Sequence, residues 1–293
     1  MNIEGVKTVA AASKIEIVNV SRTFNARKNG AASREKFFAL KDFNLSVNEG
    51  EFITIVGPSG CGKSTLLDLL IGLNRADEGE IRIDGKAIAG PALDRGIVLQ
   101  GYALFPWRTV RRNVEFGLEI KGIPKKERGD IADKYIRLVD LEKFSDHFPY
   151  ELSGGMQQRV AIARALAYDP EVLLMDEPFA AVDAQTRETM QDELLTIWEK
   201  THKTIIFVTH SIEEAVGLAD RVAVMSRQPG RVKEVVNVNL PRPRRIGDVR
   251  NKPDFSILSH RVWELLQDEQ EKTVEQLPSD FEIAEKILPD AAI

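Results

Sequence analysis

The stretch GPSGCGKST, residues 57–65, sets the architecture of this chain. It follows EFITIV (51–56), an apolar run typical of a buried strand, and leads into STLLDLLIGL (64–73), whose spacing is helical. The spacing G-x-x-x-x-G-K-[ST] lets successive backbone N–H groups curl around phosphate oxygens. A Gly-rich turn is the simpler alternative, but the strand before and the helix after are the context that a phosphate loop needs. We therefore predict a nucleotide site formed by Gly57, Pro58, Ser59, Gly60, Cys61, Gly62, Lys63, Ser64 and Thr65.

Two side chains of this loop have specific predicted roles. Lys63 is expected to reach the β- and γ-phosphates, and the Ser64 hydroxyl is expected to ligate Mg²⁺. A second motif, NKPD (251–254), matches the element by which GTPases read guanine. It follows a basic, Pro-rich segment instead of a buried strand, so we interpret it as a chance match. The predicted cofactors are ATP and Mg²⁺.

Apolar segments alternate with helical ones along the chain, which predicts an α/β fold with a mostly parallel sheet covered on both faces. The predicted strands are 15–20, 43–47, 51–56, 80–85, 171–177, 203–210, 221–227 and 231–236. The polar, Gly-containing segment 25–36 is expected to be a loop. Residues from about 103 to 170 have helical patterns, as do 184–200 and 255–272. PRPRR (241–245) marks a boundary before a final helix and an acidic tail.

Polar side chains end two of the apolar strands. Asp176 and Glu177 close VLLMDEP (172–178), and because side chains alternate along a strand, the two carboxylates cannot do the same job. Asp176 is expected to face the metal, and Glu177 to polarise a water for attack on the γ-phosphate. His210 ends the next strand, beside that edge of the sheet, and is predicted to sense or stabilise the γ-phosphate. Solvated carboxylates and a structural histidine are the simpler alternatives for these positions.

A second candidate phosphate-binding segment is LSGGMQQR, residues 152–159. Ser153 is well placed to cap the helix that follows, and the two glycines expose backbone N–H groups. A well-capped helix without function is the alternative. Against it stands the order along the chain, in which this segment precedes the Asp176–Glu177 strand and then the His210 strand.

With these motifs in this order, the chain resembles the nucleotide-binding subunit of an ABC transporter, and LSGGMQQR is similar to that family's signature sequence. The resemblance covers roughly residues 15–240. It implies a P-loop NTPase core with an N-terminal antiparallel β subdomain and an inserted helical subdomain at about 103–170. We expect a cassette over 15–245, preceded by a flexible leader (1–14) and followed by a C-terminal extension (246–293).

The resemblance also implies that the site is shared between two chains. In that family the signature closes over the ATP held by a second subunit, so two ATP molecules are sandwiched in a homodimer or a pair of close paralogues. The signature residues expected to contact the ATP of the second subunit are Ser153, Gly154, Gly155, Met156 and Gln157. Asp183 matches the loop that bridges the two sites, with Val182 where the family usually has leucine. Because Glu177 is present, both sites of a homodimer are expected to hydrolyse ATP.

The resemblance also implies roles for two further residues, Phe24 and Gln100. Phe24 resembles the aromatic residue that stacks on adenine, with Phe37 and Phe38 as less favoured alternatives because they follow the predicted loop. Gln100 resembles the glutamine that contacts Mg²⁺ and the attacking water and begins the link to the membrane partner. Phe105 and Trp107, near Gln100, are either the surface that receives a permease helix or core aromatics.

The segments ALFPWRTVRRNVEFGL and LPRPRR…RVWELL look like those of importers of nitrate, sulfonate, taurine and bicarbonate. That resemblance implies an integral membrane permease as partner and, indirectly, a solute-binding protein. A soluble ABC ATPase without a transport role is the alternative. Such proteins usually carry a coiled-coil insertion, paired cassettes or a basic face, and none is visible in this sequence.

Composition limits the partners and the location that we expect. Lys plus Arg number 40 against 45 for Asp plus Glu, a net charge of −5, which gives no electrostatic reason to expect nucleic acid. A single cysteine cannot form an internal disulfide, which favours a reducing compartment. No apolar run approaches the roughly 18 residues that a membrane span requires. We therefore expect a cytoplasmic protein, peripheral to the inner membrane through its permease.

Overall fold

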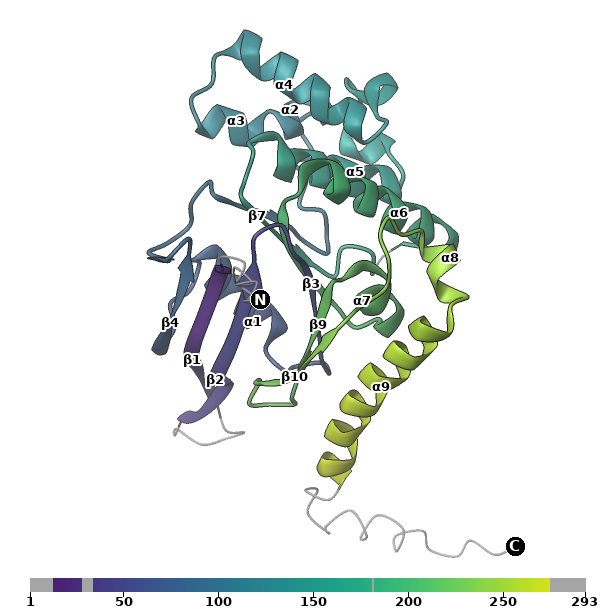
Figure 1. Ribbon diagram of the computed structural model, residues 1–293. Helices are drawn as coiled ribbons and strands as arrows, with labels where there is room; N and C mark the ends of the chain where they lie inside the picture. The colour runs from purple at the N-terminus through teal and green to yellow at the C-terminus, as the bar shows by residue number, and fades with distance from the viewer. Residues whose placement is uncertain (1–12, 28–33, 181, 275–293) are drawn as a thin grey trace, which may run out of the picture.

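The computed structural model describes residues 13–27, 34–180 and 182–274, and these form two β-sheets with helices around them (Figure 1). The smaller sheet is antiparallel, in the order β2-β1-β4-β5. Its strands are β1 (Ser13–Arg27), β2 (Arg34–Asn48), β4 (Glu78–Ile83) and β5 (Lys86–Ala87). It lies beside α1 (Lys63–Ile71), the helix that follows the phosphate loop.

The larger sheet has the order β10-β9-β3-β8-β7-β6. Its pairs are parallel except for β10, which runs antiparallel to β9. Its strands are β3 (Phe52–Val56), β6 (Arg95–Val98), β7 (Val172–Asp176), β8 (Thr204–Thr209), β9 (Arg221–Met225) and β10 (Val232–Asn237). The phosphate loop, the Asp176 edge and His210 all follow the carboxyl ends of parallel strands in this sheet, which is where ligands bind in open α/β sheets.

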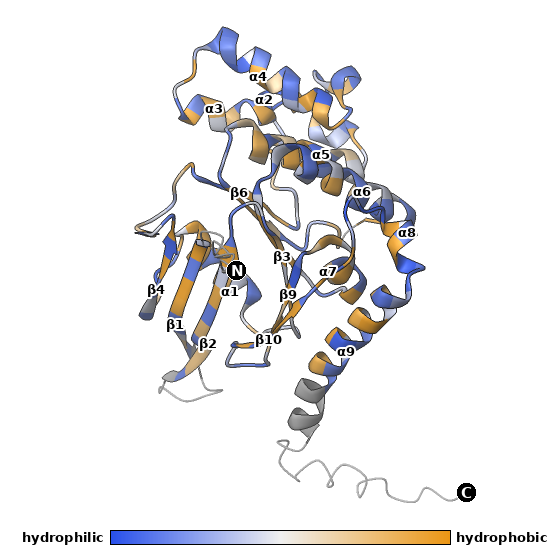
Figure 2. Ribbon diagram, in the orientation of Figure 1, coloured by the Kyte–Doolittle hydropathy of each residue, from blue (hydrophilic) through white to orange (hydrophobic). Residues whose placement is uncertain are grey.

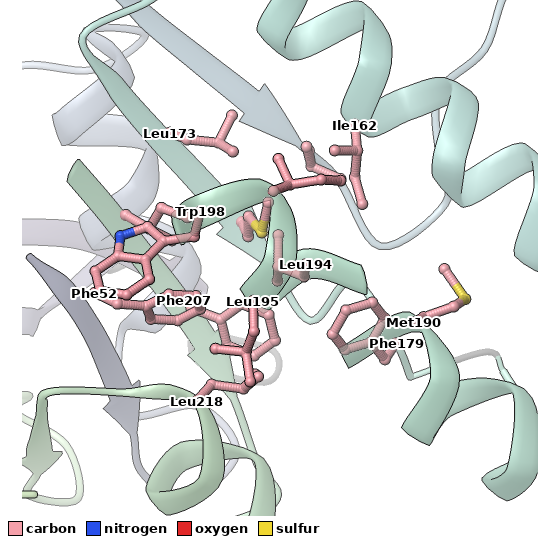
Figure 3. Packing of buried hydrophobic residues seen from close by; sticks show 14 of the residues in the cluster. Phe52, Ile162, Leu173, Phe179, Met190, Leu194, Leu195, Trp198, Phe207 and Leu218 are labelled. Atoms are coloured by element: carbon pink, nitrogen blue, oxygen red, sulfur yellow. The ribbon is translucent and has the colours of Figure 1, made fainter. Parts of the chain in front are cut away.

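Side chains of β3 alternate between two hydrophobic cores, as expected for a strand buried on both faces. Ile53 and Ile55 pack in the core that includes α1 and the smaller sheet. Phe52 packs on the opposite face, where its ring centroid lies 6.0 Å from that of Trp198 and 5.9 Å from that of Phe207 (Figure 3). That second core contains residues of α5 (Gly154–Ala167), α6 (Ala184–Thr201) and α7 (Ile212–Leu218).

Four helices between β6 and β7 form a separate lobe, at the top of Figure 1. They are α2 (Val110–Val114), α3 (Phe116–Ile120), α4 (Lys125–Leu138) and α5, with two short 3₁₀ turns at Glu142–Phe144 and Pro149–Glu151. Helix α4 is largely hydrophilic (Figure 2) and buries only Ala132 and Ile136. Helix α5 buries a much longer apolar face and is the member that joins this lobe to the core.

The chain beyond β10 packs back onto the same core. Helix α8 (Ile246–Arg250) contacts α6 and α7, and α9 (Pro253–Val274) lies against α7, β9 and β10. The segment before them is anchored by buried Arg244, whose guanidinium donates to the carbonyls of Ala219 (2.6 Å) and Leu240 (2.8 Å). Among the described residues, no helix is long and apolar enough to cross a membrane.

The predicted fold class is confirmed, because a mostly parallel sheet, an antiparallel sheet and an inserted helical lobe are all present. The predicted loop at 25–36 is wrong at both ends. Strand β1 continues to Arg27 and β2 begins at Arg34, with Phe24 opposite Phe37 in the ladder. Cross-strand pairing of aromatic side chains overrides the polar, Gly-containing local composition there. Strand β6 and helix α7 were not predicted, since each is short.

Candidate nucleotide-binding site

The phosphate loop joins β3 to α1 with a backbone that only glycine adopts readily. Gly60 has φ +77° and Gly62 has φ +103°, both in the left-handed region. At Gly62 a Cβ atom would also lie 2.7 Å from the carbonyl oxygen of Ala39. The loop is therefore pressed against β2 at Gly62, and a side chain there would push the loop away from β2. At Gly60, by contrast, no heavy atom of the described residues, apart from Gly60 and its two chain neighbours, lies within 4 Å of the position that a Cβ would take.

Lys63 is buried under the loop that it follows. Its Nζ donates to the carbonyl oxygens of Gly57 (2.8 Å) and Pro58 (3.1 Å). The ammonium group is thus held within the loop, where a phosphate group bound to the backbone N–H groups would meet it. Cys61 is buried beside it, and burial raises the pKa of the thiol, so this cysteine is a packing residue and not a nucleophile.

A pocket of about 440 Å³ opens over the loop. One wall is aromatic, since Phe24 and Phe37 lie with ring centroids 6.1 Å apart, and the Arg22 guanidinium lies 5.1 Å from the Phe24 ring. The pocket is lined by Phe24, Phe37, Ala39, Ser59, Gly60, Gly62, Lys63, Ser64, Thr65, Glu177 and Gln228. The structure therefore brings Phe24, the phosphate loop and Glu177 together around one space. It also places Phe37, the less favoured aromatic, in the same wall.

Phe24→Ala is expected to weaken ATP binding by about 1–3 kcal/mol, the usual contribution of a base stacked on an aromatic ring. Phe24→Tyr keeps the ring and should have almost no effect. The measurement is the ATP dissociation constant by calorimetry, with Phe38→Ala as the matched control because Phe38, on the same strand as Phe37, does not line this pocket. If Phe37→Ala produces the loss and Phe24→Ala does not, the stacking residue is Phe37.

The metal side of the site joins Ser64 and Asp176. Alternation along β7 puts Asp176 on the face of Leu174, which is covered by α1, the helix that contains Ser64. Burial raises the pKa of Asp176, and the nearby Glu177 charge adds to the rise, while Lys63 and Ser64 oppose it. Bound positive charge would lower that pKa. A hydroxyl and one carboxylate are oxygen ligands of the kind that suit Mg²⁺ held jointly with phosphate oxygens.

Glu177 and His210 meet at the end of the adjacent strands β7 and β8. Glu177 has φ +44°, and its N–H donates to the Val208 carbonyl at 3.0 Å, so the backbone turns sharply after Asp176. Glu177 Oε2 lies 2.9 Å from Nδ1 of His210. The Glu177 side chain is 22% exposed and that of His210 is 66% exposed. The pair therefore stands at the open side of the pocket, where a water molecule can reach the carboxylate.

The other predicted residues lie elsewhere on this chain. Ser153 caps α5, accepting from the N–H of Met156 at 3.3 Å, and both Ser153 and Gly154 are exposed. Gln157 donates from its side chain to the Pro149 carbonyl at 3.0 Å. Like Gln100, which is also exposed, none of these residues lines the phosphate-loop pocket.

Asp183 caps α6 and accepts from the N–H of Thr186 at 3.0 Å. That backbone hydrogen bond lowers the pKa of the Asp183 carboxyl. Asp183 does not line the phosphate-loop pocket either, and Val182 beside it is buried. A larger pocket of about 610 Å³ between α4 and α6 contains none of the predicted site residues. Gln228, which does line the nucleotide pocket, was not predicted, because nothing in its local sequence marks it.

The fold and the phosphate-loop site define an ATP-binding cassette of the P-loop class, and comparisons with known proteins agree. Residues 40–180 match the ABC transporter family. An uncharacterized ABC transporter ATP-binding protein of Methanocaldococcus jannaschii is 53% identical over 256 residues, covering 87% of this chain and 92% of that protein. The nitrate import ATP-binding protein of Synechocystis sp. is 45% identical over 270 residues, covering 90% and 99%.

A solved ATP-binding cassette, dimeric in a post-hydrolysis state and bound to ADP and Pi, is also similar. It aligns with a TM-score of 0.66 and 35% identity, covering 78% of this chain and 100% of that one. The chain belongs to the ABC transporter family of ATP-binding proteins, whose members hydrolyse ATP in a process coupled to transport.

Proposed function

We propose that this chain is the ATP-hydrolysing subunit of an ABC importer, which couples ATP turnover between two cassettes to uptake of a small anion through a separate permease. One observation carries the proposal. The pocket over the phosphate loop is built without any signature residue, while Ser153 and Gly154 are exposed and already shaped as a helix N-terminus. A site split in this way is completed by the signature of a second subunit.

Within that site each group has a role that follows from its position. Lys63 is placed to bind the β- and γ-phosphates, and Ser64 and Asp176 would hold Mg²⁺, which would neutralise phosphate charge. Glu177 polarises the attacking water, and His210, 2.9 Å from it, keeps the carboxylate turned toward the pocket. Gln100, on an exposed loop, is assigned to contacts with Mg²⁺ and the attacking water, and Asp183, also exposed, to the bridge between the two sites.

An exposed aromatic residue supports a permease contact. Trp107 is 72% exposed, whereas Phe105 is half-buried, with its ring 4.6 Å from that of Phe116 and 5.5 Å from the Arg108 guanidinium. Phe105 therefore anchors the loop, and Trp107 presents apolar surface to a partner. Large exposed aromatic side chains are enriched where proteins bind one another. A membrane partner would place the chain at the cytoplasmic face of the inner membrane, with a solute-binding protein on the other side.

The transported solute is proposed as nitrate, a sulfonate such as taurine, or bicarbonate, with nitrate favoured by the Synechocystis relative. A strain that carries Glu177→Gln in this gene should lose uptake of one isotopically labelled anion among these and keep uptake of the others. The wild-type strain and a strain with Glu213→Gln, an exposed carboxylate outside the pocket, are the controls. Unchanged uptake of every solute would contradict the proposed anions. Failure of the tagged chain to co-purify with an integral membrane protein would favour a soluble ABC ATPase.

A further inference from the structure

A buried carboxylate that has no part in the site described so far lies just behind His210. Glu214 is in the first turn of α7 and is 7% exposed. Its Oε2 accepts from the Thr209 hydroxyl, and its Oε1 accepts from Nε2 of Gln191, on α6, at 3.1 Å. Thr209 and Gln191 are each 1% exposed. A carboxylate is costly to bury, so one retained among hydrogen-bond partners that are themselves buried needs a reason.

Glu214 fixes the backbone on both sides of His210. Thr209, which donates to Glu214, also accepts from the N–H of Ser211 at 3.0 Å. The Ser211 hydroxyl in turn accepts from the N–H of Glu214 at 3.3 Å. The residues before and after His210 are therefore joined to Glu214 in one set of hydrogen bonds, which fixes the backbone from which the His210 side chain projects. The next residue, Ala215, accepts from the Thr54 hydroxyl of β3 at 3.2 Å, which ties this set of hydrogen bonds to the strand before the phosphate loop.

The same carboxylate faces the loop that carries Asp183. Arg187, on α6, donates to the carbonyl oxygen of Val182, the residue before Asp183, at 2.8 Å. Its Nε lies 3.9 Å from Oε1 of Glu214 and, among the described residues, has no hydrogen-bond partner. A shift of about 1 Å would bring this pair to hydrogen-bond distance. Glu214 thus stands between the His210 loop and the Asp183 loop.

We infer that Glu214 is a positioning residue that connects His210 to the Asp183 loop through Arg187 and Gln191. When the interface closes at the Asp183 loop, this connection fixes the position of the loop that carries His210. Asp183 is assigned to the bridge with the second subunit, and His210 orients the Glu177 carboxylate at the reacting end of the site. Through this connection, binding of the second subunit at the Asp183 loop changes the position of His210 at the reacting end of the site. This inference rests on the proposed roles of His210 and Asp183 and does not depend on the solute.

The chain offers a matched control on the same turn of α7. Glu213 is 60% exposed and pairs with Arg250 at 3.1 Å, and Arg250 also pairs with Glu188 of α6 at 2.9 Å. Glu213→Gln removes a carboxylate that also links α6 and α7 but touches neither loop. Glu214→Gln replaces a buried carboxylate by an amide of the same shape. Both carboxylate oxygens of Glu214 accept hydrogen bonds, so glutamine, with one oxygen and one NH₂ group, removes the charge and one of the two acceptors.

The test is steady-state ATP hydrolysis by the full-length protein, with the ATP dissociation constant and melting temperature measured in parallel. Glu214→Gln should lower kcat by about tenfold to a hundredfold, since a misplacement of about 1 Å can cost about a hundredfold, and should leave ATP affinity within about twofold. Glu213→Gln should behave as the wild type. Arg187→Ala should lower kcat in the same way. The fold-loss of kcat in the double variant should be much smaller than the product of the two single losses, because both substitutions break the same connection.

A wild-type kcat for Glu214→Gln would overturn the inference, and so would a loss found only in melting temperature or ATP affinity. Losses that multiply in the double variant would also overturn it. If Glu214→Gln fails to fold, Arg187→Ala provides the test, because Arg187 is partly exposed. A wild-type kcat for Arg187→Ala would mean that the proposed connection does not exist. An inactive wild-type chain would overturn the proposed function as well, whereas an active wild type beside an equally active Glu214→Gln overturns this inference alone.

Discussion

Glu177→Gln is expected to bind ATP normally and to hydrolyse it about a hundredfold to ten-thousandfold more slowly, the range over which a general base contributes. Glu177 lines the pocket and lies 2.9 Å from His210 Nδ1, so it stands where a water attacking the γ-phosphate must be oriented. Glutamine keeps the size and a hydrogen-bonding oxygen but cannot take up the proton. The variant should therefore accumulate with ATP bound, as a dimer.

Single-turnover phosphate release measures the chemical step, and size-exclusion chromatography with bound-nucleotide analysis measures the trapped dimer. Glu213→Gln is the matched control, because it makes the same carboxylate-to-amide change on an exposed side chain that does not line the pocket. Wild-type phosphate release from Glu177→Gln would remove Glu177 from its proposed role. Loss of ATP binding together with hydrolysis would instead show that the residue supports the pocket.

A mixed dimer is expected to trap one nucleotide where each parent homodimer traps little or none. One chain carries Lys63→Ala, which removes the buried ammonium of the phosphate loop. The other carries Ser153→Arg, which fills the exposed N-terminus of α5 with a bulky, charged side chain. If two chains share each site, the defective loop faces the defective signature, so both defects fall in one site. The remaining site pairs an intact loop with an intact signature.

Nucleotide trapping is the appropriate measurement, since it reports on each site even when turnover depends on coupling between the two sites. Differently tagged chains, purified in two affinity steps, provide verified mixed dimers, and the wild-type dimer sets the level for two intact sites. If each chain builds its own complete site, every site in the mixed dimer is damaged. Verified mixed dimers without trapped nucleotide would therefore mean that Ser153 and its glycines serve their own chain.

Much of the fold and of the candidate site follows from short stretches of sequence. The phosphate loop is recognisable because its glycines, Lys63 and Ser64 act through the backbone of one turn and the helix that follows it. Asp176 and Glu177 are assigned different faces by strand alternation alone. Ser153 is predicted as a helix cap and observed as one. In each case the atoms that interact are close together along the chain, so local pattern is sufficient.

Contacts between distant segments were beyond the reach of that reasoning. The segment 25–36 is polar, yet all of its described residues are strand, because antiparallel pairing brings Phe24 opposite Phe37 and builds the aromatic wall of the pocket. Glu214 looks like an ordinary helix carboxylate until folding buries it between Thr209 and Gln191. The sequence by itself determines which functional groups the chain carries and which of them lie in the same local turn. The packing of α6 against α7, and of one hairpin strand against the other, decides which of those groups meet, because burial and cross-strand registry arise only when distant parts of the chain come together.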